Sequence, residues 1–185
     1  MNLPNFITLG RLLAVPVEIW LVLSGELTAA FALFVLAGLS DGVDGYIAKR
    51  FDQRTELGAL LDPIADKALL VSLFVTLGLS GHLPNWLVIL VVFRDVLIVG
   101  GFLLGSMLGG ESRARPLLIS KANTGFQILL VAYTLARLGL GFDGAEIGIR
   151  IGTALVDMVA ATTVLSGAAY LVRWARTLAG MEPPK

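Results

Sequence analysis

The sequence contains no cysteine and only one histidine, His82. These two shortages limit the kinds of metal site and catalytic group that the chain can form. Without cysteine the chain forms neither a disulfide framework nor a zinc–thiolate site. A single histidine excludes a metal site built from several histidines and leaves little basis for a Ser-His-Asp triad. Any metal ion must therefore be bound by carboxylates, which favours hard cations such as Mg²⁺ or Mn²⁺.

Charged residues are also scarce. They make up 15% of the 185 residues, whereas 56% are hydrophobic, and the mean hydropathy is +0.84. This composition excludes a disordered chain, a coiled coil and a nucleic-acid-binding protein. A water-soluble domain of this size cannot bury so much apolar surface. The composition therefore predicts an all-α integral membrane protein, with residues 1–185 forming one domain.

Six apolar stretches are long enough to cross a bilayer as helices. Turn residues such as Gly25, Gly81 and Gly141 separate them. The residues before the first stretch, 1–10, are interpreted as a short interfacial segment. The six expected transmembrane helices are 8–24, 28–49, 58–80, 84–108, 120–140 and 145–173.

Lysine and arginine gather on one side of these expected spans, which predicts that both termini are cytoplasmic. The opposite turns carry mostly acidic residues and His82. The basic residues beside the second connection, the fourth connection and the C-terminus are, in chain order, Lys49, Arg50, Arg54, Lys67, Arg113, Arg115, Lys121, Arg173, Arg176 and Lys185.

Four aspartates lie around the connection between the second and third spans. Asp41 and Asp44 are three residues apart at the end of one helix, and Asp62 and Asp66 are four apart at the start of the next. Each pair therefore shares a helix face. Because the intervening loop is short, the two helices are expected to be antiparallel neighbours. The four carboxylates then converge near the cytoplasmic interface.

Four carboxylates placed together repel one another and are costly to remove from water. One or two bound Mg²⁺ or Mn²⁺ ions would relieve both problems. Gly45 and Gly58 have no side chains and allow a ligand to approach the backbone closely. An isolated aspartate near a helix end is usually a solvated cap, but two spaced pairs with two glycines favour a metal site. Nearby lysine and arginine suggest a diphosphate substrate.

Residues 41–66, here called the aspartate signature, resemble the signature of the CDP-alcohol phosphatidyltransferase family. That signature reads D-x-x-D-G-x-x-A-R, then eight residues, then G-x-x-x-D-x-x-x-D. Every fixed position is matched except one, because Lys49 stands where the family has arginine. Lysine keeps the positive charge but cannot form a bidentate pair with a phosphate.

The resemblance implies transfer of a phosphatidyl or similar group from a CDP-linked donor to a hydroxyl, with release of CMP. It also implies that Asp41, Asp44 and Asp62 bind metal, and that Asp66 is a ligand or near-ligand and the general base. Helix capping by Asn5 or Thr8 is an equal alternative to donor contact at the N-terminus. The donor-binding positions that the resemblance implies are Asn5, Thr8, Gly45, Ala48, Lys49, Thr55 and Gly58.

The acceptor is less firmly indicated. Stretches 34–41, 93–98 and 119–124 resemble the cardiolipin synthases, whose acceptor is phosphatidylglycerol and whose product is cardiolipin. The related phosphatidylglycerophosphate synthases instead use glycerol 3-phosphate. Both acceptors carry a phosphate that basic side chains could bind, although the loop arginines could equally bind anionic lipid headgroups. The candidate acceptor-binding residues are Arg94, Arg113, Arg115 and Lys121.

Arg94 and Asp95 lie well inside the fourth expected span, where charges are costly. Adjacent residues on a helix do not face each other, which makes Asp157 of the sixth span a possible partner for Arg94. Acceptor binding and a structural ion pair both remain open for Arg94. Glu18 of the first span has no obvious partner.

Two other classes of function compete with the transferase. A cation transporter would use the same carboxylates, but such proteins usually show internal repeats and a site at the middle of the membrane. A membrane scaffold explains the helices but not the four aspartates in register. The resemblance further implies a homodimer, and the repeated glycines 101, 105 and 109 form a packing face within or between subunits.

Overall fold

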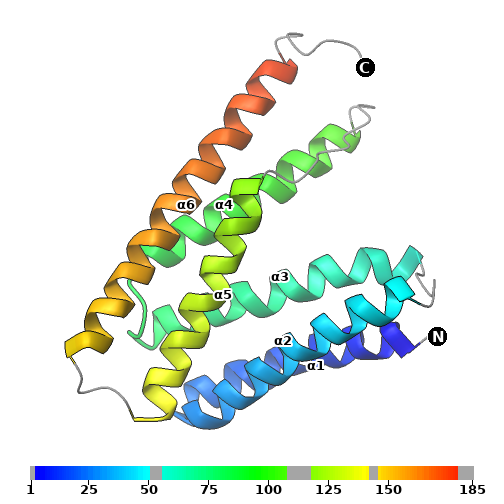
Figure 1. Cartoon of the computed structure of the whole chain (residues 1–185). Helices are drawn as coiled ribbons and strands as arrows, with labels where there is room; N and C mark the ends of the chain where they lie inside the picture. The colour runs from blue at the N-terminus through cyan, green and yellow to red at the C-terminus, as the bar shows by residue number, and fades with distance from the viewer. Residues whose placement is uncertain (1–2, 51–55, 108–117, 142–145, 179–185) are drawn as a thin grey trace.

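A computed structural model describes the backbone of residues 3–50, 56–107, 118–141 and 146–178, and these residues form six α-helices (Figure 1). Side chains are described for residues 9–40, 67–101, 118–141 and 146–176. No strand occurs in the described ranges, which agrees with the all-α prediction. The helices are α1 (Leu3–Leu23), α2 (Leu27–Arg50), α3 (Glu56–Leu79), α4 (Asn85–Met107), α5 (Leu118–Gly139) and α6 (Glu146–Leu178).

Each expected span corresponds to one helix, and α2 to α5 begin and end within two residues of the expected bounds. The outer two helices are longer than expected. α1 begins at Leu3, so residues 3–10 of the expected interfacial segment are helical and continue directly into the first expected span, and their interfacial position stays a prediction. Pro4 suits a first turn, where its missing N–H has no intrahelical partner. α6 continues to Leu178, since no glycine or proline occurs between Arg173, the expected end, and Leu178.

Two of the helix ends are closed by the same glycine motif. At the end of α1, Gly25 has a φ of 77°, its N–H donates to the carbonyl of Val22, and the N–H of Glu26 donates to that of Leu21. Gly81, with a φ of 75°, closes α3 in the same way. This is the Schellman arrangement, in which a residue with positive φ satisfies the last carbonyls of a helix. The turns expected at these glycines are confirmed.

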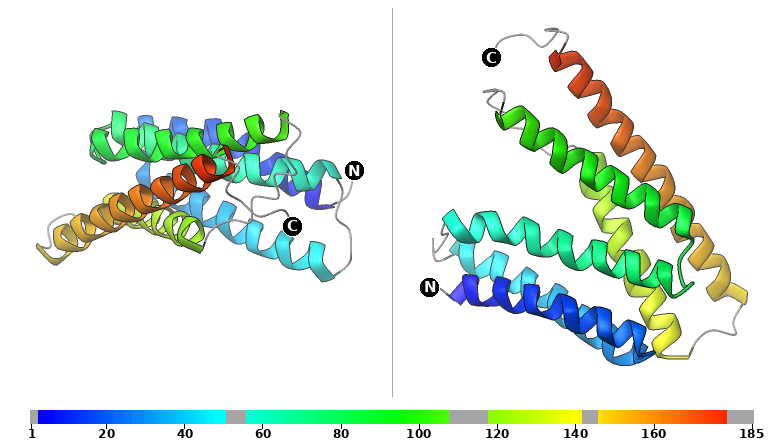
Figure 2. Two further views of the ribbon diagram at one scale, coloured as in Figure 1. Left: turned by 90° about the horizontal axis from the view of Figure 1, so that it is seen from above. Right: turned by 180° about the vertical axis from the view of Figure 1, so that it is seen from behind.

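The helices pack in a continuous series around a shared apolar core. α1 contacts α2 and α3, α2 contacts α5, α5 contacts α6, and α6 contacts α4. Figure 2 shows α1, α2 and α3 running alongside one another while α5 and α6 cross them at an angle. Fully buried side chains from α3, α4, α5 and α6 meet in this core, including Leu73, Phe74, Leu87, Leu130 and Val159.

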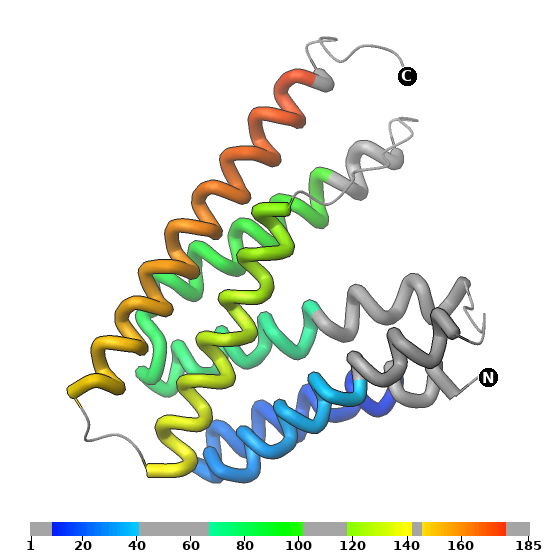
Figure 3. Tube along the Cα trace, viewed as in Figure 1, coloured from blue at the N-terminus to red at the C-terminus, as the bar shows by residue number. Residues whose placement is uncertain are grey.

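α3 and α4 separate as they leave the turn that joins them. The coloured parts of these two helices in Figure 3 diverge from that turn, and the view from behind in Figure 2 shows the same divergence. Leu83, Leu87 and Val91 are buried in the core near the turn. Further along the two helices, Lys67 of α3 forms an ion pair with Asp95 of α4.

The outer surface of the bundle is rich in large apolar side chains. Trp20, Leu36, Leu79, Ile89 and Ile147 each expose more than half of their surface. Such a surface suits a bilayer rather than water. Among the residues with described side chains, Glu146–Arg176 of α6 is long and apolar enough to span a membrane by itself. The prediction of six spans remains a prediction.

Candidate active site

The aspartate signature occupies the last turns of α2 and the first turns of α3. Residues 51–55 join these helices, so the end of α2 and the start of α3 lie at the same end of the bundle (Figure 1). The backbone therefore places the two aspartate pairs on helix ends at the same end of the bundle. Among the described residues α2 and α3 do not contact each other and both pack on α1, so the convergence of the four carboxylates stays a prediction. Their side chains lie outside the described residues, as do those of Gly45, Ala48, Lys49, Thr55 and Gly58.

The donor set of the signature fits a hard divalent cation. Asp41, Asp44, Asp62 and Asp66 provide only carboxylate oxygens, and Mg²⁺ and Mn²⁺ prefer oxygen ligands. Elsewhere, the side chains that the structure describes contain no cluster of three or more histidines, aspartates and glutamates. The signature therefore remains the candidate metal site. Asn5, Thr8, Arg113 and Arg115 also lie outside the described side chains.

Arg94 lies at the centre of a buried polar cluster that joins four helices. Only 3% of its surface is exposed. Its Nη1 donates to Asp95 Oδ1 at 2.6 Å, its Nη2 donates to Ser166 Oγ at 2.6 Å, and a further Nη2 bond goes to Ser120. Together with Lys67, these residues are here called the Arg94 cluster, and they come from α3, α4, α5 and α6.

Asp95 accepts hydrogen bonds from two cations. One carboxylate oxygen is bound by Arg94, and the other accepts from Lys67 Nζ at 2.7 Å. The Asp95 side chain is 6% exposed, whereas that of Lys67 is 34% exposed. Lys67 directly follows Asp66 along α3. The Arg94 cluster therefore reaches the helix that carries the second aspartate pair.

The expected pairing of Arg94 with Asp157 is wrong. The partner of Arg94 is the adjacent residue Asp95, because the arginine side chain is long enough for its guanidinium to reach a neighbouring carboxylate. Asp157 is exposed and lies nine residues before Ser166, or about 13 Å along the helix axis at 1.5 Å per residue. Of the two roles left open for Arg94, the described contacts are those of an ion pair.

Polar residues of α5 to which the sequence analysis assigned no individual role also face the bundle interior. Asn123 and Gln127 are fully buried, and Asn123 Oδ1 accepts hydrogen bonds from Thr162 at 2.8 Å and Thr163 at 2.9 Å. With Ser120 they follow the spacing i, i+3, i+7, which marks one helix face. That spacing within an apolar span was the available signal. The candidate residue Lys121 lies off this face and is exposed.

Glu18 is another buried polar side chain, but its contacts differ from those of Asn123. It is fully buried on α1, and neither carboxylate oxygen has a hydrogen-bond partner in the part of the chain that is described.

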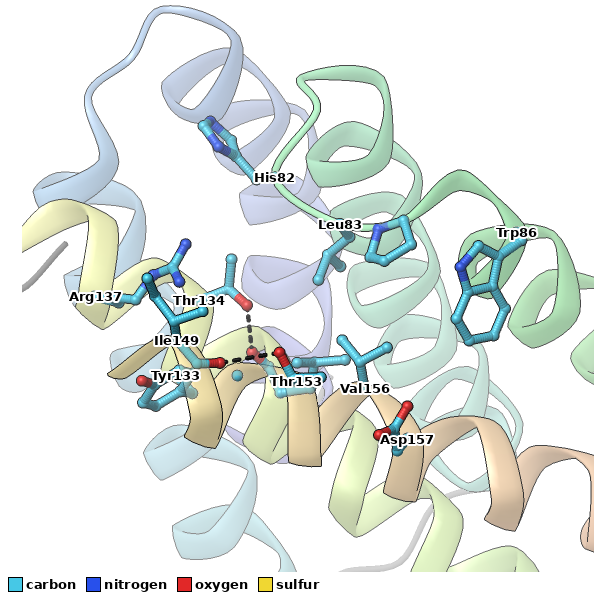
Figure 4. Close-up of a pocket in the computed structure, with 13 residues that line it drawn as sticks. His82, Leu83, Trp86, Tyr133, Thr134, Arg137, Ile149, Thr153, Val156 and Asp157 are labelled. Atoms are coloured by element: carbon cyan, nitrogen blue, oxygen red, sulfur yellow. Dashed lines mark hydrogen bonds between the residues drawn. The ribbon is translucent and has the colours of Figure 1, made fainter. Parts of the chain in front are cut away.

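A cavity of about 360 Å³ lies at the end of the bundle opposite the signature. Figure 4 shows its lining, with Thr134 and Thr153 from α5 and α6 each donating to a carbonyl of its own helix. His82, Trp86 and Asp157 also line it. Neither Arg94 nor Lys121, the candidate acceptor-binding residues whose side chains are described, lines this cavity.

Comparison with known proteins decides among the three classes of function. The family model of CDP-alcohol phosphatidyltransferases matches residues 1–176. The chain belongs to the CDP-alcohol phosphatidyltransferase family. Members of this family are membrane proteins, which accounts for the apolar surface of the bundle.

Relatives with two different names resemble this family member at similar identity. It is 34% identical over 94% of its length to a chloroplastic CDP-diacylglycerol–glycerol-3-phosphate 3-phosphatidyltransferase of Oryza sativa, covering 57% of that protein. It is 35% identical over 92% of its length to a cardiolipin synthase (CMP-forming)/mitochondrial hydrolase fusion protein of Schizosaccharomyces pombe, covering 31% of it.

The human cardiolipin synthase (CMP-forming) is 33% identical over 73% of this chain. The chain covers 50% of that protein, and it likewise spans about half or less of most of the relatives it matches. The two names among the relatives correspond to the two acceptors that the sequence left open.

Proposed function

We propose that the chain transfers a phosphatidyl group from CDP-diacylglycerol to a glycerol hydroxyl of phosphatidylglycerol, giving cardiolipin and CMP. The aspartate signature carries this proposal, since all four aspartates and both glycines stand in register inside a chain matched by the family model. Relatives named as cardiolipin synthases support phosphatidylglycerol as the acceptor. The site would lie at the cytoplasmic face, where the basic residues gather.

In this proposal the aspartates have two roles. Asp41, Asp44 and Asp62 hold Mg²⁺ or Mn²⁺, with Asp66 a further or nearby ligand. A bound divalent cation offsets the charge of the donor diphosphate and of the departing CMP. Asp66 takes the proton from the acceptor hydroxyl. The hydroxyl oxygen bonds to the phosphorus of the phosphatidyl group as the P–O bond to CMP breaks. All atoms of the donor are then found in the lipid product and CMP.

The remaining assignments follow the resemblance. The donor is bound by Asn5, Thr8, Gly45, Ala48, Lys49, Thr55 and Gly58. Arg113, Arg115 and Lys121 are assigned to binding of the acceptor phosphate. Of these, Lys121 is exposed at the start of α5, where a substrate can reach it. A homodimer in the membrane is part of the same proposal.

The test supplies the purified protein with labelled CDP-diacylglycerol and Mg²⁺, and offers phosphatidylglycerol or glycerol 3-phosphate in parallel. Cardiolipin on thin-layer chromatography, with equimolar CMP, is the expected product. Asp66→Asn should lower turnover by about 10²- to 10⁴-fold, the usual contribution of a general base. Asp157→Asn is the matched control, because this exposed acid lies outside the signature. Full activity in EDTA would contradict the metal assignment.

Glycerol 3-phosphate is the second candidate acceptor. The observation favouring it is the similarity to the Oryza sativa phosphatidyltransferase, which extends over 94% of this chain. Formation of phosphatidylglycerophosphate without cardiolipin would establish this alternative and leave the roles of the aspartates unchanged.

A further inference from the structure

The Arg94 cluster has one cation that is fully enclosed and one that is not. The Arg94 guanidinium is buried and donates to Asp95, Ser120 and Ser166, so its donors are directed at protein groups. Lys67 is one-third exposed, and in the described part of the chain its ammonium donates only to Asp95. An ammonium has three donors, so two of them remain for a ligand.

The charge balance of the cluster also favours an anion at Lys67. Two cations share the single carboxylate of Asp95, which leaves the group with a net charge of +1. The excess positive charge is located at Lys67, the exposed cation of the Arg94 cluster. Phosphate oxygens form short, charge-assisted hydrogen bonds with such an ammonium.

Lys67 is also placed beside the reacting groups along the chain. It follows Asp66 directly in α3, so its position is turned about 100° around the helix from that of the general base. The Lys67 ammonium contacts Asp95 of the neighbouring helix α4, with 2.7 Å between Nζ and Oδ2. Because Arg94 also binds the Asp95 carboxylate, this carboxylate is a defined anchor for the flexible Lys67 side chain.

We propose that Lys67 binds a phosphate of a substrate, and that Asp95 is a positioning residue that holds the Lys67 ammonium while Arg94 fixes Asp95. The inference rests on the proposed function, which supplies the phosphate. That phosphate belongs either to the donor diphosphate or to the acceptor, and the chemistry of recognition is the same for both. Arg94 accordingly acts on substrate binding through Asp95.

The principal test compares Lys67→Gln with Lys67→Arg. Loss of one charge-assisted hydrogen bond should raise the KM of the substrate whose phosphate Lys67 binds by about tenfold or more, with a much smaller change in kcat. Lys67→Arg keeps the charge and should recover most of the loss. KM values measured separately for CDP-diacylglycerol and for the acceptor identify which phosphate is bound. Asp95→Asn should raise the same KM, by a smaller factor.

The matched control is the Glu146–Arg150 pair, which has the same 2.7 Å separation but lies exposed at the opposite end of the bundle. Arg150→Gln should leave both KM values within twofold. Thermal unfolding of each variant separates the proposal from a purely structural ion pair. If Lys67→Gln lowers the Tm while both KM values stay within twofold, or if kcat alone falls, the proposal is overturned.

A binding measurement keeps the inference independent of turnover. Inorganic phosphate and pyrophosphate should raise the Tm of the parent protein, and this protection should be reduced in Lys67→Gln but kept in Arg150→Gln. If the parent protein transfers to neither acceptor, the proposed function fails, while lost protection in Lys67→Gln would still support a phosphate site. Equal protection in the parent and in Lys67→Gln would overturn that site.

Discussion

The two ends of the helix bundle are held together by different means. At the end opposite the signature, α2 and α5 meet through their backbones, where Thr28 Oγ1 donates to the carbonyl of Gly139 at 2.6 Å. Glycine turns at Gly25 and Gly81 close α1 and α3 there. Nearer the signature, α3 and α4 are joined by the Lys67–Asp95 ion pair.

At the end opposite the signature, close backbone packing determines how the helices sit together. Between α3 and α4, an ion pair does so. A backbone contact leaves no room for an added atom, so substitutions there should change stability through steric overlap. An ion pair between diverging helices leaves room, so substitutions there should act through the charge that remains. The backbone contact lies at the end of the bundle opposite the signature, and the ion pair lies nearer the end that carries the proposed chemistry.

The largest effect on stability is expected from Arg94→Met, which removes the centre of the charged region. Asp95 would stay buried with Lys67 as its one cation, and Ser120 and Ser166 would lose their donor. Breaking a buried pair by removing one partner costs about 3–5 kcal/mol. The measurement is the free energy of unfolding in detergent.

The double variant Arg94→Met, Asp95→Leu sharpens this prediction. Removing both charges leaves no buried carboxylate that has lost the Arg94 guanidinium, so much of the lost stability should return. Arg150→Met, at the exposed pair, should change stability by less than about 1 kcal/mol. A loss in Arg94→Met no larger than in this control would show that the Arg94 cluster does not hold α4 to α6.

A smaller effect on stability is expected from Gly139→Ala, which tests the backbone contact between α2 and α5. A Cβ at this position would lie 2.8 Å from the backbone carbonyl of Leu27 and the nitrogen of Thr28. Backbone atoms cannot rotate away as a side-chain end does, so α2 and α5 must separate. Overpacking of this kind costs about 1–3 kcal/mol.

The matched control for Gly139→Ala is Gly125→Ala on the same helix. A Cβ at Gly125 meets nothing within 4 Å. Alanine favours a helix over glycine by about 1 kcal/mol, so this variant should be neutral or more stable in thermal unfolding. Equal losses in the two variants would indicate that α2 and α5 do not touch at Gly139.

The fold could be predicted from the sequence because its strongest signals are local. Apolar stretches of membrane length and glycine turns determine where helices begin and end, so α2 to α5 were placed within two residues. The extension of α1 to Leu3 was missed, since an interfacial segment and a first helical turn have the same composition.

The candidate site could be predicted only in part. The aspartate signature was found because its spacing repeats within two helices that are consecutive in the chain. The partner of Arg94 was not, because the choice between Asp95 and Asp157 depends on how far α6 is displaced along α4. Ser120 and Ser166 were missed for the same reason, since they come from helices that are distant in the sequence.

The smallest effect is expected at Gly81, where neither steric overlap nor charge is involved. Its φ of 75° lies in the left-handed region, yet a Cβ there meets nothing within 4 Å. Gly81→Ala should therefore cost about 1 kcal/mol, from backbone conformation alone. Gly81→Asn should cost less, because asparagine adopts this conformation more readily than alanine does. Unfolding free energies that rank the parent above Gly81→Asn and Gly81→Asn above Gly81→Ala would identify backbone conformation as the cause. Equal losses of unfolding free energy in the two variants would instead indicate that an added side chain meets other atoms at this turn. Steric overlap would then explain the effects of substitution at Gly81 as well as at Gly139.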